Sequence, residues 1–401
     1  MQELDRVLGG GIVPGSVVLL AGEPGVGKST LLLSMARQWA AGAGSPALIV
    51  SGEESTAQVR LRAERTGAVH ENLYLAAEND LGAVLSHIDD VSPGLLIVDS
   101  VQTVAADSVE AAAGSVSQIR AVTAALIAQA KARGMATVVV GHVTKDGGIA
   151  GPRVLEHLVD VVLVFEGDRH SSLRLLRSTK NRYGAADEVG CFEMREDGIA
   201  GLADPSGLFL SQRSAAVPGT CVTVTIEGRR PMLAEVQALV IPTGAATPRR
   251  AVTGLDAARV AMLTAVIHRH TKTRLIDREV YAGSIGGIAL TEPAADLAIA
   301  LAIGSAEAEL PMPQRLCAIG EVSLSGDVRR VSGLERRLAE AIRLGFTVAL
   351  VPRGHVGDAV APRAEGITVV PISTVQDALT AVGNLRHNPA PKRSTALRTV
   401  N

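Results

Sequence analysis

Short apolar runs, rich in Val, Ile and Leu, alternate with segments of helical periodicity through the first part of the chain. Runs that are apolar at every position, rather than at every second one, are typical of strands buried on both faces. The pattern therefore predicts an α/β fold with a mostly parallel sheet flanked by helices. Strands are expected at residues 17–21, 47–51, 72–76, 95–99 and 136–142, helices at 31–40, after Ser55, at 81–88 and 116–133, and a hairpin at 159–168 and 172–180 that turns at 168–171.

The alternation stops at residues 204–214, where Pro and Gly begin to recur, and this break predicts a domain boundary. We expect a first domain at 1–203, a linker at 204–218, a second domain at 219–385 and a basic, disordered tail at 386–401. The second domain is expected to be α+β, with strands at 220–228, 233–240, near Val280 and at 347–352, a strand pair around Ala318 and Val328, and helices at 255–270, 294–306, 334–344 and near Val375.

Composition narrows the classes of function. Of 401 residues, 47% are hydrophobic but only 2% aromatic, so a nucleic acid would be held by its backbone rather than by stacked rings. The formal net charge of −2 excludes a protein that is basic all over, but allows a ring that is basic only along its channel. Three scattered cysteines fit buried thiols and do not support zinc. Without a membrane-length apolar run or a signal peptide, the chain is predicted to be cytoplasmic.

The segment GEPGVGKS, residues 22–29, lies between an apolar strand and a helix, which is the setting of a phosphate-binding loop. Its glycines let backbone N–H groups turn toward phosphates, Lys28 adds a charge, and the Ser29 hydroxyl can ligate Mg²⁺. A Gly-rich turn that merely opens a helix is the alternative. The loop predicts ATP and Mg²⁺ as ligands, with the nucleotide bound by Gly22, Glu23, Pro24, Gly25, Val26, Gly27, Lys28, Ser29 and Thr30.

Acidic residues at two strand ends complete the predicted hydrolytic site. Asp99 ends the run LLIVD, where its carboxylate can hold Mg²⁺ through water. Glu53 and Glu54 follow the run ALIVS and open toward the same edge of the sheet, where a carboxylate can direct the attacking water. We favour Glu53, which comes first off the strand. The alternative role is helix N-terminal charge with Ser51 or Ser55 as the cap, and one glutamate could serve each role.

His142 ends the run ATVVVGH and precedes a Gly-rich segment that carries Lys145 and Arg153. At this edge of the sheet its ring can contact the γ-phosphate and report the loss of that group to the segment behind it. The alternative is a strand-end histidine whose ring is satisfied by backbone groups.

Two cations, Lys180 and Arg182, leave a strand at a turn closed by Gly184 in the segment RSTKNRYGAADE. A surface turn with exposed charges is one interpretation. In ring-forming ATPases, however, such cations reach into the neighbouring site and stabilise charge on the transferring phosphoryl group.

Together these motifs resemble the bacterial RadA (Sms) family of RecA-like DNA repair ATPases. The segment LDRVLGGGIVPGSVVLLAGEPGVGKSTLLL is similar to the opening of that family's ATPase core. The run KNRYG is similar to its KNRFG signature, with Tyr183 in place of Phe, and Lys180 and Arg182 match the cations proposed to act across the subunit interface. The resemblance covers about residues 4–371. RadA proteins normally begin with a four-Cys zinc module, whereas this chain begins almost at the core, through trimming or natural absence.

The resemblance implies a homo-hexameric ring that uses ATP to move along single-stranded DNA. Such a ring drives branch migration of recombination intermediates, with RecA as a candidate partner. Residues 101–117 and 143–153, the latter with Lys145 and Arg153, match the two loops that face DNA in RecA-like rings. The family's nucleotide and Mg²⁺ residues match Lys28, Ser29 and Asp99, and its RecA-type catalytic glutamate matches Glu53.

The second domain looks like the proteolytic domain of Lon, but it lacks the chemistry of a protease. Lon carries a nucleophilic Ser in a Pro-Ser-Ala-Gly run and an activating Lys after a Gly-Leu pair. The corresponding runs here are TEPAAD and SGLERR, with Ala294 and Glu335 at those positions. We therefore expect a proteolytically inactive scaffold that forms the ring and contacts DNA. The alternative to a DNA translocase is an ATP-binding scaffold or signalling ring that does not move DNA.

Overall fold

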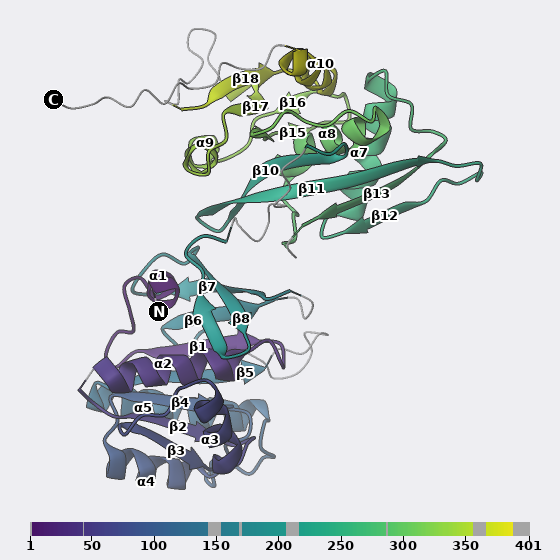
Figure 1. The fold of residues 1–401 in the computed structure, drawn as a ribbon. Helices are drawn as coiled ribbons and strands as arrows, with labels where there is room; N and C mark the ends of the chain where they lie inside the picture. The colour runs from purple at the N-terminus through teal and green to yellow at the C-terminus, as the bar shows by residue number, and fades with distance from the viewer. Residues whose placement is uncertain are drawn as a thin grey trace, which may run out of the picture. The chain divides into compact units, whose positions relative to one another are not determined.

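The computed structural model describes residues 2–42, 44–142, 154–167, 171–205, 216–285, 288–355 and 366–387. The chain divides into two compact units, Met1–Ala203 and Asp204–Asn401, each with a sheet and helices of its own (Figure 1). The division falls where Pro and Gly begin to recur in the sequence.

A nine-stranded sheet forms the centre of the first unit, in the order β3-β2-β4-β5-β1-β6-β7-β8-β9. The strands from β3 to β6 in this order run parallel, and β7, β8 and β9 add antiparallel pairs. This confirms the predicted α/β class with a mostly parallel sheet. The strands are β1 (Val17–Gly22), β2 (Ala47–Ser51), β3 (Leu73–Ala77), β4 (Leu95–Asp99), β5 (Ala136–His142), β6 (Val161–Glu166), β7 (Leu173–Asn181), β8 (Val189–Arg195) and β9 (Gly198–Gly201).

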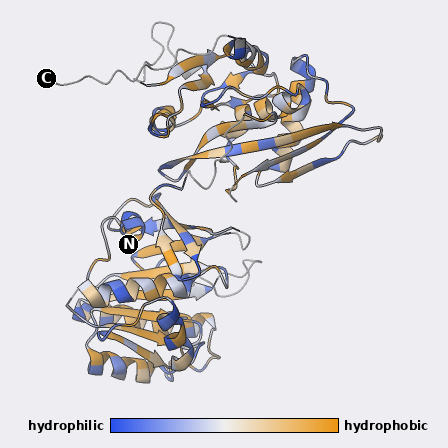
Figure 2. Ribbon diagram, in the orientation of Figure 1, coloured by the Kyte–Doolittle hydropathy of each residue, from blue (hydrophilic) through white to orange (hydrophobic). Residues whose placement is uncertain are grey.

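Helices pack on both faces of this sheet. They are α1 (Gln2–Leu8), α2 (Lys28–Gly42), α3 (Thr56–Arg65), α4 (Leu81–Val91) and α5 (Val116–Arg133). On one face Leu20 of β1 shares a core cluster with Leu31 of α2, and on the other Leu19 shares a cluster with Leu126 of α5. Since successive β1 residues are buried on opposite faces, the strand is apolar almost throughout, as Figure 2 shows.

The parallel register brings the predicted chemical residues to one edge of the sheet. Gly22 at the end of β1 lies beside His142 at the end of β5, and Ser51 at the end of β2 lies beside Asp99 at the end of β4. Parallel strands all end at the same edge, which is where open α/β sheets bind ligands. The phosphate loop, Asp99 and His142 therefore share one site.

The second unit is built on a mixed seven-stranded sheet in the order β12-β13-β11-β10-β14-β17-β18, with a separate ribbon of β15 and β16. Its strands are β10 (Thr220–Glu227), β11 (Arg230–Pro242), β12 (Arg250–Thr253), β13 (Arg278–Ser284), β14 (Leu316–Ala318), β15 (Glu321–Val322), β16 (Val328–Arg329), β17 (Val348–Pro352) and β18 (Thr368–Ile372). Its helices are α7 (Ala257–His270), η2 (Pro293–Ala295), α8 (Asp296–Glu307), α9 (Leu334–Arg343), η3 (Arg353–His355) and α10 (Val375–His387).

Two predictions for the second unit need correction. The strand pair expected around Ala318 and Val328 does not form. Ala318 pairs with Leu350 inside the main sheet, and Val328 pairs with Val322 across a local turn. Helix α10 continues to His387, so the tail predicted from 386 begins inside a helix, and its residues from 388 onward lie outside the described part of the chain. No helix in the described ranges is long and apolar enough to cross a membrane.

Candidate functional site

The loop between β1 and α2 has the backbone shape of an anion-binding nest. Gly25 and Gly27 adopt φ angles of 80° and 108°, which residues with a side chain rarely do. A Cβ on Gly27 would also lie 3.1 Å from the Met194 sulfur, and one on Gly22 would lie 2.5 Å from the Phe165 carbonyl oxygen. Within the described ranges the N–H groups of Gly25 and Gly27 donate to no protein acceptor. These N–H groups can therefore donate to phosphate oxygens.

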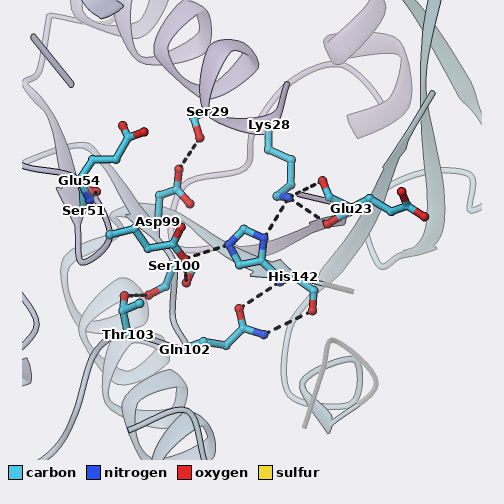
Figure 3. Close-up of polar contacts among 12 residues, drawn as sticks. Glu23, Lys28, Ser29, Ser51, Glu54, Asp99, Ser100, Gln102, Thr103 and His142 are labelled. Atoms are coloured by element: carbon cyan, nitrogen blue, oxygen red, sulfur yellow. Dashed lines mark hydrogen bonds and ion pairs between the residues drawn. The ribbon is translucent and has the colours of Figure 1, made fainter. Parts of the chain in front are cut away.

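Lys28 lies at the start of α2 and is only 5% exposed. Its Nζ donates to the carbonyl oxygens of Gly22 at 2.9 Å and Glu23 at 3.0 Å, and lies 3.2 Å from His142 Nδ1 (Figure 3). Burial lowers the pKa of Lys28, and two nearby carboxylates partly offset this effect. The ammonium is thus held by neutral partners that a phosphate oxygen, with its greater charge, can replace.

Ser29 and Asp99 provide two oxygen atoms next to the loop. The Ser29 hydroxyl donates to Asp99 Oδ2 over 2.8 Å. Burial raises the pKa of Asp99, while the hydrogen bond from Ser29 lowers it. Hydroxyl and carboxylate oxygens are the ligands that Mg²⁺ prefers, and a cation here would offset the cost of burying the carboxylate. The donor set therefore fits the predicted Mg²⁺.

Glu53 and His142 are in contact within the site. Glu53 Oε1 accepts a hydrogen bond from Ser100 Oγ at 2.7 Å and lies 3.0 Å from His142 Nε2. Because the Lys28 ammonium can only donate, His142 Nδ1 accepts from it, and Nε2 carries the hydrogen that Glu53 accepts. One imidazole thus joins the loop lysine to the glutamate, and its ring is engaged by side chains rather than by backbone groups.

The neighbouring Glu54 has different surroundings. Its carboxylate pairs with Arg62 of α3, and its N–H donates to the Ser51 hydroxyl. Ser55 caps α3 by accepting from the backbone N–H of Gln58. The two glutamates therefore have different contacts: Glu54 contacts Arg62 of α3, while Glu53 contacts Ser100 and His142.

Two residues that hold this site, Ser100 and Gln102, were not singled out from the sequence, and Gln102 holds His142 by its backbone. Its Oε1 accepts from the His142 N–H at 3.1 Å, and its Nε2 donates to the His142 carbonyl oxygen at 3.3 Å. This amide holds the end of β5 against the loop that follows β4. Its place three residues after Asp99, in a segment expected to face DNA, is the only sequence signal for it.

The end of β7 and the turn that follows it are held by contacts within their own unit. Lys180 Nζ donates to the carbonyl oxygens of Glu156 at 2.6 Å and Val159 at 2.8 Å. Arg182 pairs with Asp160 at 3.2 Å, and its side chain is 55% exposed. In the described part of the chain neither cation contacts the group around Lys28 or Glu53. Lys145 and Arg153, the predicted DNA contacts, lie outside the described residues.

The two positions of the second unit that were compared with Lon carry neither the hydroxyl nor the amine of that protease. Ala294 lies in η2, buried in one core cluster with Leu334, and Glu335 is exposed on the first turn of α9. Two residues along the helix, Arg337 is 1% exposed and donates to both carboxylate oxygens of Glu292, at 2.6 and 2.8 Å. An ion pair between a buried guanidinium and a half-buried carboxylate therefore lies close in sequence to both altered positions.

Comparison with known proteins places this geometry in a family. The DNA repair protein RadA of Mycolicibacterium smegmatis is 60% identical over 358 residues, which cover 88% of this chain and 76% of the relative. This chain belongs to the RadA family. The RadA protein of Mycobacterium tuberculosis is 54% identical over 401 residues, which cover 100% of this chain and 82% of the relative. The RadA protein of Bacillus subtilis is 46% identical over 379 residues, which cover 94% of this chain and 82% of the relative.

Two family models match parts of this chain. The model described as an AAA domain matches residues 2–148, which include the phosphate loop, Asp99 and His142. The model described as subunit ChlI of Mg-chelatase matches residues 288–355 in the second unit. The first unit is therefore a nucleotide-binding ATPase domain, as the loop predicts.

Proposed function

We propose that this RadA-family protein is a ring-shaped ATPase that moves along single-stranded DNA during DNA repair and recombination. The observation that carries the proposal is the contact chain from Lys28 through His142 to Glu53. It joins the phosphate loop to the end of β5, from which the segment expected to face DNA departs. The similar proteins are named as DNA repair proteins, which supports the biological setting.

ATP binding begins at the phosphate loop. The N–H groups of Gly25 and Gly27 and the Lys28 ammonium hold the β- and γ-phosphates. Ser29 and Asp99 would hold Mg²⁺, which supplies positive charge to the phosphate oxygens. The negative charge that moves onto the leaving oxygen is therefore met by groups already in place, which is the main source of catalysis in phosphoryl transfer.

Glu53 is the residue proposed to direct water. Its carboxylate is fixed by Ser100 and His142, so it can accept a hydrogen bond from a water molecule aligned with the γ-phosphorus. As the water oxygen bonds to that phosphorus, the bond to the ADP oxygen breaks, and the water proton passes to Glu53. ADP and inorganic phosphate are the products.

His142 is proposed to report the nucleotide state. A γ-phosphate that binds Lys28 Nζ competes with His142 Nδ1 for the same ammonium, and the loss of phosphate restores their contact. The His142 backbone is bonded on both polar groups to Gln102, which lies in the other segment expected to face DNA. A change at His142 would thus be passed to residues 101–117 through the hydrogen bonds with Gln102, and to residues 143–153 along the chain.

The DNA contacts are tested through Lys145 and Arg153. If these residues bind phosphates of the DNA backbone, Lys145→Ala and Arg153→Ala will each weaken binding of single-stranded DNA. Each will also make the slope of log affinity against log salt concentration less steep by about one. Fluorescence anisotropy of a labelled oligonucleotide at several salt concentrations measures both quantities. Lys131→Ala, at an exposed position in the last turn of α5, is the control. Wild-type DNA affinity in both variants would contradict the assignment.

Lys180 is proposed to act on the site of a neighbouring subunit. To do so its ammonium must leave the carbonyl oxygens of Glu156 and Val159. We expect Lys180→Ala to bind ATP almost normally and to hydrolyse it at least about tenfold more slowly. Phosphate release at saturating ATP, with thermal unfolding as a check on the fold, measures this. An unchanged rate would place the turn outside the active site.

The second unit serves in this proposal as a scaffold for the ring. Ala294 and Glu335 provide neither the hydroxyl nor the amine that peptide hydrolysis needs in a Lon-type site. ATP hydrolysis is therefore directed to movement and not to proteolysis.

A further inference from the structure

Arg174 is a buried cation beneath the phosphate loop. It lies on β7 and is 7% exposed. Its Nε donates to the Val26 carbonyl oxygen at 2.8 Å, and its Nη1 donates to the carbonyl oxygens of Ser171 at 2.6 Å and Leu173 at 2.8 Å. One guanidinium thus ties the phosphate loop to the start of β7, which lies far away in the sequence.

The bond to Val26 sets the direction of the next N–H group. In a trans peptide the C=O and N–H groups point in opposite directions. With the Val26 carbonyl directed at Arg174, the Gly27 N–H points away from the guanidinium, and it finds no acceptor among the described residues. This is the arrangement that a phosphate-binding loop needs, because its N–H groups must be oriented before the ligand arrives.

The surroundings of Arg174 leave it little freedom to move. A Cβ on Gly167 would lie 2.3 Å from Arg174 Cδ and 3.0 Å from its Nε. Gly167 does not have a positive φ, so its backbone can accept alanine. The space that a Cβ would need at this position is taken mainly by Arg174 and also by the Leu173 carbonyl oxygen, 2.9 Å away, so a methyl group there would displace the guanidinium and press on the start of β7.

We propose that Arg174 is a positioning residue of the nucleotide site. By fixing the Val26–Gly27 peptide and adding a permanent positive charge below the loop, it strengthens binding of nucleoside diphosphates and triphosphates relative to monophosphates. The inference rests only on the nucleotide-binding part of the proposed function and requires neither DNA nor a ring.

Nucleotide binding without DNA tests the proposal. Fluorescent ADP is titrated directly, and AMP is measured by competition. Arg174→Met should weaken ADP binding at least about tenfold, which is the range for a lost hydrogen bond to a charged group. It should weaken AMP binding by less than about twofold. Gly167→Ala should weaken ADP binding in the same direction while it keeps the arginine. Arg174→Lys, which keeps the charge but not the planar donors, should fall between wild type and Arg174→Met.

The control is Arg177→Met on the same strand, where Arg177 bonds to Glu166 at 2.8 Å. It should bind both nucleotides like the wild type. Thermal unfolding monitors the fold of each variant, and Gly167→Ala carries the test if Arg174→Met does not fold. Wild-type ADP affinity in the folded variants, or equal losses for ADP and AMP, would overturn the role of Arg174. Failure of the wild type itself to bind ADP would instead contradict the proposed ATPase function.

Discussion

Replacing Lys28 with alanine is expected to reduce ATP turnover at least about a hundredfold and to weaken ATP binding. The ammonium donates to the loop carbonyls of Gly22 and Glu23, on the side where the phosphates are expected to bind. Without it, the negative charge of the γ-phosphate loses its nearest partner before and during bond cleavage. Phosphate release and titration with a fluorescent ATP analogue measure the two effects.

The control for this change is Lys131→Ala, which removes an exposed lysine from α5 and should leave both measurements unchanged. Thermal unfolding shows whether the variant keeps its fold. Turnover by a folded Lys28→Ala protein above about a tenth of the wild-type rate would mean that ATP is hydrolysed at another site.

Glu53→Gln is expected to lower kcat at least about a hundredfold while ATP still binds, because the amide keeps the size of the carboxylate but cannot take a proton from water. Its side-chain oxygen can still accept from Ser100 and His142, so the surrounding contacts are preserved. The measurement is the rate of phosphate release at saturating ATP, together with the affinity for the ATP analogue.

The matched control for Glu53 is Glu54→Gln. Glu54 pairs with Arg62 rather than with His142, so its loss should affect kcat less than about threefold. If Glu54→Gln is the slower of the two variants, the assignment of the water-directing carboxylate is reversed.

The fold of the first unit was largely predictable because its parallel strands are continuous apolar runs in the sequence. Runs such as LLIVD are apolar at every buried position, and parallel strands must end at one edge, so Asp99, His142 and the phosphate loop could be placed together before any contact was known. Short strands gave weaker signals. Strand β9, four residues long, and the two-residue ribbon strands have too few positions for a pattern.

The supporting contacts could not be predicted, since they join residues that only the folded sheet brings together. Arg174 and Val26 are 148 positions apart, and Gln102 and His142 are 40 apart. Neither Arg174 nor Gln102 was one of the residues that the motifs singled out. Lys180 shows the converse: its charge suggested a free cation, but in the structure its ammonium bonds to two carbonyl oxygens, which a sequence pattern does not reveal.

The most direct test of DNA-driven ATP use is the rate of ATP turnover with and without single-stranded DNA, at fixed protein and salt concentrations. We predict that DNA raises the rate of the wild-type protein and that Lys145→Ala and Arg153→Ala lose this increase while they keep the DNA-free rate. Identical turnover with and without DNA would contradict it and would favour an ATP-binding scaffold that does not move on DNA.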